Sequence, residues 1–183
     1  MTESERCEVL KKRQETISAV VSKYSTPPQE DADEYFMSAA LELATAGVEF
    51  EEVPVGCVIV RDGRIIAADF NGRESLKEAT YHAESAAITE ACRVLGGWRL
   101  PGCTMYVTLE PCPMCAGAVW CARIPKVVIG ARDLRAGAFG TLIDLNSYPL
   151  NHKPGLVFGV LEEECRRAMQ DFFAARRGKN KNI

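Results

Sequence analysis

The feature that most constrains this chain is a set of metal-binding side chains from two distant segments. His82-Ala83-Glu84 forms the first segment, and Cys112 and Cys115 form a Cys-x-x-Cys pair in the second. A structural zinc site normally has four protein ligands, whereas a catalytic one has three and leaves the fourth position to a water whose pKa falls towards ~7. His82, Cys112 and Cys115 therefore predict a catalytic zinc site with one ion per chain, and Glu84 remains to move the protons of that water.

The metal-binding residues lie at the N-termini of two predicted helices. The patterns predict one helix from His82 to Leu95, ended by Gly96-Gly97, and another from Cys112 to Arg123. Cysteines three apart in a first helical turn can present both sulfurs to one side, and the partial positive charge at a helix start favours thiolates. We therefore expect both helix N-termini to face the metal.

Each part of the set also has an ordinary explanation. A Cys-x-x-Cys pair is found in redox dithiols, structural zinc half-sites and apolar cores, and a lone histidine is often a hydrogen-bonded core residue. Cys92, Cys121 or His152 could supply a fourth ligand and close a structural site. Cys121 follows Cys115 by six residues, which is roughly 9 Å along a helix. The combination of residue types, order and helix placement favours the catalytic interpretation.

Composition indicates one globular domain in a reducing compartment. The chain has 183 residues, of which 47% are hydrophobic, enough for one core. Its eight cysteines fall mostly within apolar patterns, which is typical of buried free thiols. The N-terminus lacks an apolar signal core, and the longest uncharged run, residues 111–122, is shorter than the ~20 residues of a membrane span. We expect a cytoplasmic protein without membrane association.

Charge is distributed unevenly along the chain. The net charge of −3 argues against a protein that coats nucleic acid by bulk electrostatics. Residues 31–52 nevertheless hold seven acidic residues and no Lys or Arg, while the chain ends on Arg176, Arg177, Lys179 and Lys181. This ending is either a solvated helix terminus or a contact for phosphates.

The remaining patterns predict a mixed sheet with helices on both faces. Asp62-Gly63 suits a tight hairpin turn between two strands. We divide the chain into an N-terminal extension with a short helix and a Pro-containing linker (1–32), a zinc domain (33–178) and a basic tail (179–183). Besides the two helices above, we expect helices at 33–47 and 162–177 and strands at 55–60, 65–70, 104–109, 126–131 and 156–161.

Several motifs resemble those of the bacterial tRNA-specific adenosine deaminases. The resemblance covers about residues 33–178, and the zinc motif itself is shared by all cytidine-deaminase-like enzymes. Residues 130–140 and the Asp-Phe-Phe…Arg-Arg ending are the parts that select this family. The matching stretches are Val53-Pro54-Val55-Gly56, Asn71, His82-Ala83-Glu84, Trp98-Arg99-Leu100, residues 106–118, Gly130-Ala131-Arg132-Asp133, Gly137-Ala138, Asn151-His152, Gly159-Val160-Leu161, Asp171-Phe172-Phe173 and Arg176-Arg177.

The resemblance implies a three-layer α/β/α fold with a five-stranded mixed sheet, a homodimer, and conversion of the wobble adenosine of a tRNA anticodon loop to inosine. Glu84 would be the general acid and base, a role that the known signature of zinc nucleobase deaminases assigns. Asn71 would hydrogen-bond the flipped base next to the Ala83 backbone, and Val53, Leu109 and Pro111 would wall its pocket. The RNA contacts implied or suggested are Asp133, Arg135, His152, Phe172 and Arg176.

Two other functions remain open at this point. A deaminase of a free nucleobase or nucleoside (guanine, cytidine or adenosine) would keep every zinc residue but need no RNA surface. A non-catalytic, zinc-stabilised RNA-binding module would not need Glu84. The sequence also departs from the family pattern in residues 1–32, in the flanking Tyr81 and Ser85, and in the loop before His82.

Overall fold

The structure is a computed structural model that describes residues 1–25 and 31–180. Pro27-Pro28 of the expected linker and the last three residues of the expected tail lie outside the described residues. The described helices are α1 (Glu3–Lys23), α2 (Ala32–Gly47), α3 (Arg73–Leu76), α4 (Ala83–Leu95), α5 (Pro113–Ala122) and α6 (Glu162–Asn180), with short 3₁₀ turns at Val48–Phe50 and Leu145–Ser147. The strands are β1 (Gly56–Arg61), β2 (Arg64–Phe70), β3 (Cys103–Leu109), β4 (Lys126–Ala131) and β5 (Gly155–Phe158).

The five strands form one mixed sheet in the order β2-β1-β3-β4-β5. β1 pairs antiparallel with β2 and β3, whereas β3, β4 and β5 run parallel. Asp62 and Gly63 both have positive φ, 50° and 72°, in the turn that joins β1 to β2. This is the tight hairpin that Asp-Gly predicts.

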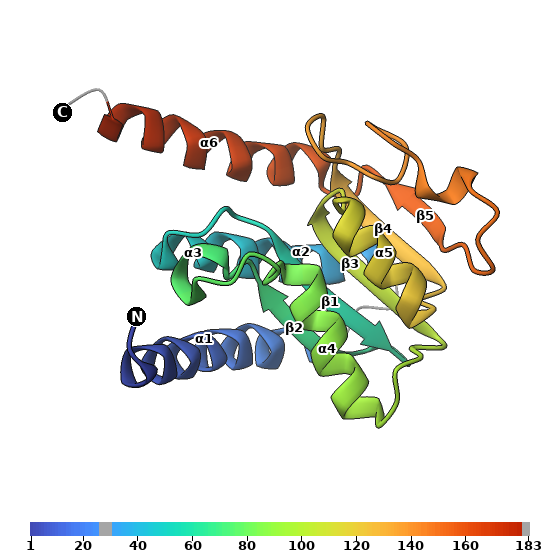
Figure 1. The fold of residues 1–183 in the computed structure, drawn as a ribbon, viewed down its shortest axis with the longest axis horizontal. Helices are drawn as coiled ribbons and strands as arrows, with labels where there is room; N and C mark the ends of the chain where they lie inside the picture. Colours follow the sequence, from blue (N-terminus) through green and yellow to red (C-terminus); the bar gives the residue numbers. More distant parts are fainter. Residues whose placement is uncertain (26–30, 181–183) are drawn as a thin grey trace.

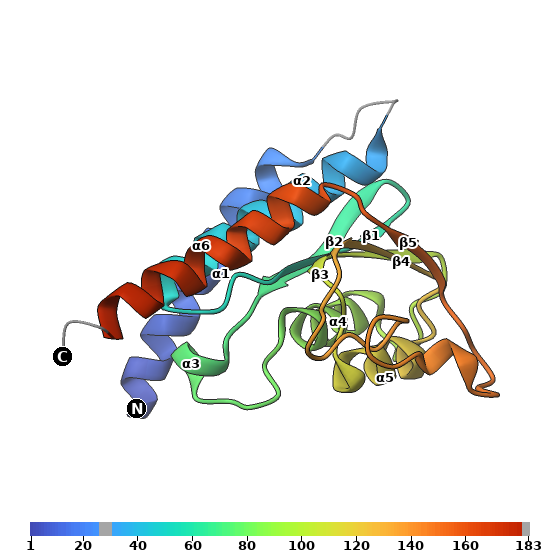
Figure 2. The same ribbon diagram turned by 90° about the horizontal axis from the view of Figure 1, so that it is seen from above.

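Helices cover both faces of the sheet, which confirms the three-layer α/β/α fold (Figure 1, Figure 2). Alternate residues of β1 show the division: Cys57 and Ile59 pack towards α4 and α5, while Val58 and Val60 pack towards α1 and α2. Both sets are buried, so the strand is apolar on both sides instead of alternating with polar residues. The sheet is therefore packed on one face against α4 and α5 and on the other against α1 and α2.

α1 forms most of the predicted N-terminal extension. Its 21 residues start at a capping box, in which Thr2 and Glu5 satisfy each other's backbone N–H groups. Ile17 and Val20 join the core that contains α2 and β2, and Arg13 is only 2% exposed. The helix therefore packs closely onto the molecule, and the domain division at residue 32 stays a prediction.

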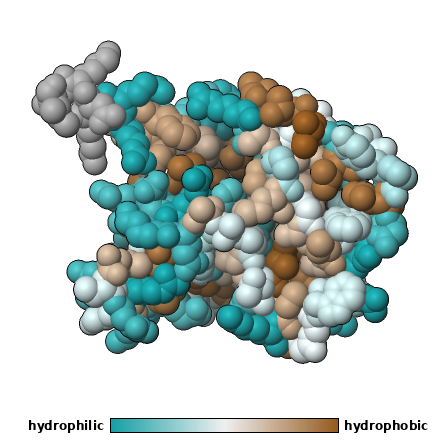
Figure 3. Space-filling view, viewed as in Figure 1, coloured by the Kyte–Doolittle hydropathy of each residue, from teal (hydrophilic) through white to brown (hydrophobic). Residues whose placement is uncertain are grey.

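In the described part of the chain, no helix is both long and apolar enough to cross a membrane. Hydrophobic side chains gather on the surface over the loop that follows β4, whereas the surface over α3 is mainly hydrophilic (Figure 3). Leu134, Leu142 and Ile143 of that loop are exposed.

Candidate metal centre and substrate cleft

The metal-binding side chains meet where two helices start. His82 is the residue immediately before α4, and Cys112 is the residue immediately before α5. Cys115 lies in the first turn of α5, after Pro113 at the first helical position. β3 ends at Leu109 and delivers Cys112 to this position three residues later. The predicted arrangement, with two helix N-termini facing one point, is what the fold contains.

The donor atoms have the spacing that zinc requires. His82 Nδ1 lies 3.7 Å from Cys112 Sγ and 3.6 Å from Cys115 Sγ, and the donor atoms all lie within 4.8 Å of one another. Bonds of ~2.0 Å to nitrogen and ~2.3 Å to sulfur at a tetrahedral angle would separate N and S by about 3.5 Å. The three side chains therefore fit one zinc ion bound through Nδ1 of the histidine.

The protonation of the two thiols follows from their mutual contact. Hydrogen bonds from Cys115 and His82 lower the pKa of the Cys112 thiol to about 3. The Cys115 thiol donates to Cys112 and is buried, so its own pKa is raised well above the usual value. One thiolate beside a second sulfur and an imidazole is a donor set suited to a divalent cation.

Glu84 lies two residues after His82, in the first turn of α4, and is 3% exposed. Burial raises the pKa of its carboxyl group. The cluster of donor atoms within 4.8 Å consists of His82, Cys112 and Cys115, while Glu84 lines the same cleft as His82 and Cys112. A buried carboxyl beside a three-donor metal site is placed to exchange protons with whatever binds there.

The cleft has a volume of about 600 Å³, which suits a small ring system. It opens at the carboxyl ends of the parallel strands β3 and β4, where ligands commonly bind to open α/β sheets. Five exposed arginines line its rim, although the protein carries a net charge of −3. They are Arg73, Arg132, Arg135, Arg166 and Arg177.

Asn71 lines the cleft and is held from behind by Glu52. The Asn71 Nδ2 atom donates to Glu52 Oε2 at 3.0 Å, and Glu52 Oε1 accepts from Ser75 N at 2.7 Å and Ser75 Oγ at 2.8 Å. Glu52 is fully buried. A carboxylate can only accept, so the NH₂ side of the amide must face Glu52. Asn71 Oδ1 is then left as an acceptor for a group in the cleft.

Glu110 anchors the loop that forms the opposite wall. Its carboxylate accepts from the backbone N–H groups of Phe139 at 2.9 Å, Thr141 at 3.2 Å and Asp133 at 3.3 Å. Glu110 is 2% exposed and precedes the Pro111-Cys112 segment. It therefore ties the metal-binding segment to residues 133–141, and Asp133, Leu134, Arg135 and Ala136 of that loop line the cleft.

The residues expected around the base are close together. Val53, Asn71 and Leu109 line the cleft, and Ala83 is buried in the first turn of α4. Pro111 is buried, and its carbonyl oxygen accepts from Ala138 N at 2.9 Å. These positions suit the expected base pocket, whose residue roles stay predictions.

The residues expected to contact RNA separate into two groups. Asp133 and Arg135 line the cleft. Phe172 and Arg176 instead line a groove of about 610 Å³ between α2 and α6. His152 donates from Nε2 to the Ile124 carbonyl oxygen at 2.7 Å, beside the end of α5. Only the first group shares the cleft with the metal centre.

The cleft also contains residues of α6 beyond the RNA contacts expected above, and Arg177 among them belongs to the basic ending that the sequence offers as a contact for phosphates. α6 presents Phe173 and Arg177 to the cleft, together with Arg166 and Met169. Helical spacing puts Arg166, Phe173 and Arg177 on one face of α6 and Phe172 and Arg176 on the adjacent face, so the 3.6-residue period could have distinguished Phe173 from Phe172 and Arg177 from Arg176. Glu52, Glu110 and Arg73 carry no comparable signal, because only the fold brings them to the site.

Comparisons with known proteins agree with this geometry. Residues 30–131 match the family model for the cytidine and deoxycytidylate deaminase zinc-binding region. The tRNA-specific adenosine deaminase of Bacillus subtilis is 49% identical over 150 residues, which cover 81% of this chain and 93% of the relative. That of Streptococcus pyogenes serotype M18 is 44% identical, over 81% of this chain and 94% of the relative.

Solved structures extend the comparison. A protein from a study of A-to-I editing by tRNA:A34 deaminases at the wobble position superposes with a TM-score of 0.71 at 44% identity, covering 73% of this chain and 98% of that one. A guanine deaminase from Bacillus subtilis gives a TM-score of 0.52 at 34% identity, over 64% of this chain and 86% of that one. The chain belongs to the zinc-binding cytidine and deoxycytidylate deaminase family, and within it to the bacterial tRNA-specific adenosine deaminases.

Proposed function

We propose that this protein hydrolytically deaminates the wobble adenosine of a tRNA anticodon loop to inosine. The observation that carries the proposal is the combination of a three-donor zinc site, a buried Glu84 and a small cleft rimmed by arginines. The high identity to tRNA-specific adenosine deaminases supports the choice of substrate. An anticodon loop also offers bases that are already unstacked enough to enter a pocket.

His82, Cys112 and Cys115 would hold the zinc ion, which when bound supplies a Lewis acid that lowers the pKa of water. Deamination adds water to ring carbon C6 of adenine and breaks the C6–N6 bond, releasing ammonia. Glu84 accepts a proton from the attacking water and delivers protons to N1 of the ring and to the departing amine. Its burial in the cleft keeps these transfers away from bulk solvent.

The other cleft residues orient the base. Asn71 would present Oδ1 to a donor on the base, because Glu52 holds the amide NH₂. Val53, Leu109 and Pro111 would wall the ring, and the Ala83 backbone lies next to Glu84 at the same helix start. Asp133, Arg135 and the rim arginines would meet the loop around the base. We further propose, from the family resemblance, that the enzyme is a cytoplasmic homodimer; its eight free cysteines fit a reducing compartment.

The test is incubation of the purified, zinc-loaded protein with a tRNA pool, followed by sequencing for inosine. We expect adenosine-to-inosine conversion confined to position 34 in one or a few tRNAs. Glu84→Gln is the matched control: it should retain one zinc per chain and tRNA affinity but lose ~10² or more in rate. Cys112→Ala/Cys115→Ala should lose the metal.

Parallel assays with free guanine, cytidine and adenosine separate the alternatives. Turnover of a free base without tRNA conversion would replace the proposal with a nucleobase deaminase. Full activity of Glu84→Gln would remove this residue from the mechanism. Metal and tRNA binding without any turnover would indicate a non-catalytic RNA-binding module.

A further inference from the structure

One arginine of α1 contacts the backbone beneath the substrate cleft. Arg13 is 2% exposed although it belongs to an otherwise largely exposed helix. Its guanidinium donates to the carbonyl oxygens of Asn71 at 3.0 Å and Phe70 at 2.6 Å and to Asp69 Oδ1 at 2.8 Å. It also lies 3.9 Å from the centroid of the Phe70 ring. The donor fork of arginine suits this set of acceptors, which a single ammonium cannot reproduce.

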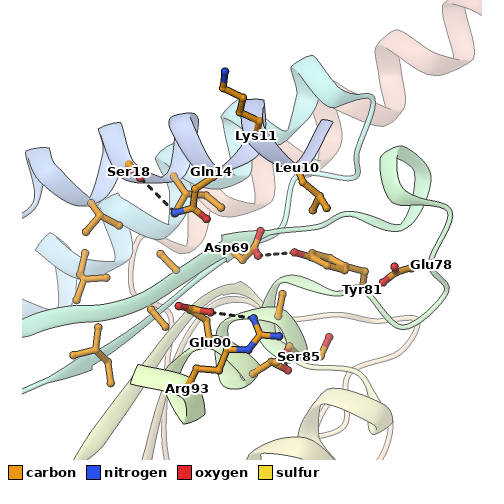
Figure 4. A pocket seen from close by; sticks show the side chains of 18 of the residues that line it. Leu10, Lys11, Gln14, Ser18, Asp69, Glu78, Tyr81, Ser85, Glu90 and Arg93 are labelled. Atoms are coloured by element: carbon orange, nitrogen blue, oxygen red, sulfur yellow. Dashed lines mark hydrogen bonds and ion pairs between the residues drawn. The ribbon is translucent and has the colours of Figure 1, made fainter. Parts of the chain in front are cut away.

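These contacts hold the start of the segment that runs from Asn71 to His82. Asp69 also accepts from the Tyr81 hydroxyl at 3.0 Å, and Tyr81 immediately precedes His82 (Figure 4). The Gly72 N–H donates to the Tyr81 carbonyl oxygen at 3.0 Å, which closes the segment at its base. Arg13 therefore contacts a loop that carries Asn71 at one end and the metal ligand His82 at the other: it binds the Asn71 end directly, and it meets the His82 end through Asp69 and the Tyr81 ring, whose centroid lies 5.2 Å from the guanidinium.

A second arginine of α1 contacts the middle of the same loop. Arg6 donates to the Leu76 carbonyl oxygen at 3.3 Å and forms an ion pair with Glu78. Figure 4 shows a pocket between α1 and α4, in which Asp69 and Tyr81 lie between the two helices and Glu78 lies at one end. The helix thus touches this loop near its beginning, middle and end.

α1 lies outside the part of the chain that matches the family model, although it contacts the loop beside the cleft. The family model begins to match at residue 30, whereas α1 ends at Lys23. Buried arginines need several acceptors to offset their desolvation. Here the acceptors are residues 69–71 and the Ser75 hydroxyl, all next to the Asn71 wall of the cleft.

We propose that α1 is a positioning element for the active site, with Arg13 as its main contact. Building on the proposed function, Arg13 fixes the Asn71 backbone and the Asp69–Tyr81 pair, and through them the orientation of the base relative to His82 and Glu84. Small misplacements of a bound substrate are sufficient to lower a rate by ~10²-fold. The helix acts without touching substrate itself.

The experiment compares Arg13→Met, Arg13→Lys and Ile17→Ala in the full chain. Ile17 lies one helical turn further along α1, is 8% exposed and packs in the core, so Ile17→Ala loosens α1 without removing any of the hydrogen bonds that Arg6 and Arg13 donate to residues 69–82. For each protein we measure zinc content, melting temperature, kcat with a tRNA substrate, and tRNA affinity in a Glu84→Gln background. Hydrogen–deuterium exchange is followed across residues 69–82.

We expect Arg13→Met to lower kcat by about tenfold or more while tRNA affinity and zinc content change little. Exchange across residues 69–82 should increase, and Arg13→Lys should fall between Arg13→Met and the wild type. Ile17→Ala, at a comparable loss of melting temperature, should keep kcat within about twofold and exchange in 69–82 near the wild-type rate, because the loop contacts remain.

An equal loss of kcat in Ile17→Ala and Arg13→Met would overturn the proposal, since the effect would then follow stability alone. Unchanged exchange across residues 69–82 in Arg13→Met would overturn it as well. The exchange measurement needs no substrate. If the wild type failed to convert tRNA, the proposed function would fail separately, while exchange would still decide whether Arg13 holds the loop.

Discussion

At the residue scale, Tyr106 joins the sheet to α2 through a partly buried hydrogen bond. Its hydroxyl donates to Asp33 Oδ1 at 2.8 Å, and Lys126 Nζ binds the same carboxylate at 2.9 Å. Tyr106 is 4% exposed. Burial, followed by the contact with Asp33, raises the pKa of its phenol above the usual value. The neutral phenol is therefore favoured in the folded state.

This shift predicts a specific alkaline sensitivity. A folded pKa above the unfolded value of ~10 means that the stabilisation is fully present below pH ~10 and is lost as pH rises further. Tyr106→Phe should cost about 0.5–1.5 kcal/mol at pH 7 through the lost hydrogen bond. That difference should shrink above pH 10 in urea unfolding experiments. Tyr148→Phe, at an exposed position, is the control, and a difference that stays constant to pH 11 would contradict the prediction.

The residues that could be predicted from the sequence are those whose chemistry is local. His82, Cys112 and Cys115 are recognisable because zinc requires particular donor types at helix starts. Glu52 and Glu110 were not identified, because their acceptor roles depend on backbone groups that only the fold brings to them. The role of Arg13 could not be predicted from the sequence either, because its hydrogen-bond partners lie more than fifty residues away along the chain.

At the element scale, hydrophobic periodicity was sufficient for the sheet and its principal helices. The expected strand at 126–131 coincides with β4, and the expected helix at 82–95 differs from α4 by one residue at its start. The expected strand at 156–161 was too long, because β5 ends at Phe158 and Gly159 adopts a positive φ of 87°. The short α3 and the two 3₁₀ turns have too few residues for a periodic signal.

The loop after β4 depends on a glycine packed against Glu110. A Cβ atom at Gly137 would lie 2.5 Å from Glu110 Oε2 and 2.6 Å from the Asp133 carbonyl oxygen. Gly137→Ala must therefore displace the Glu110 carboxylate or the loop that lines the cleft. We expect a loss of about 1–3 kcal/mol of unfolding free energy, the usual cost of overpacking, and a lower kcat/KM with tRNA.

Urea unfolding and steady-state kinetics test this expectation. Gly97→Ala is the matched control, because nothing lies within 4 Å of its added Cβ atom. It should change the unfolding free energy by no more than about 0.5 kcal/mol and leave kcat/KM unaltered. Wild-type stability in Gly137→Ala would show that the Glu110 anchor has room to move.

At the scale of the whole molecule, charge is separated between the faces of α6. The protein has a net charge of −3, yet five arginines line one cleft. Arg177 lies at this cleft, whereas the adjacent Arg176 lines the groove between α2 and α6, where Arg167 and three acidic residues, Glu51, Glu164 and Asp171, also lie. A phosphate backbone entering the catalytic cleft would therefore meet Arg177 and not Arg176.

This separation predicts different salt dependences for two neighbouring substitutions. Each lost phosphate contact flattens the log–log dependence of affinity on salt by up to ~1. In a Glu84→Gln background, Arg177→Ala should weaken tRNA binding and flatten the slope, whereas Arg176→Ala should leave both near those of the parent. Affinity measured from low to moderate salt, with melting temperature as a control, tests this. A larger effect of Arg176→Ala would place the RNA along the groove between α2 and α6, because the phosphates would then follow the other face of the helix.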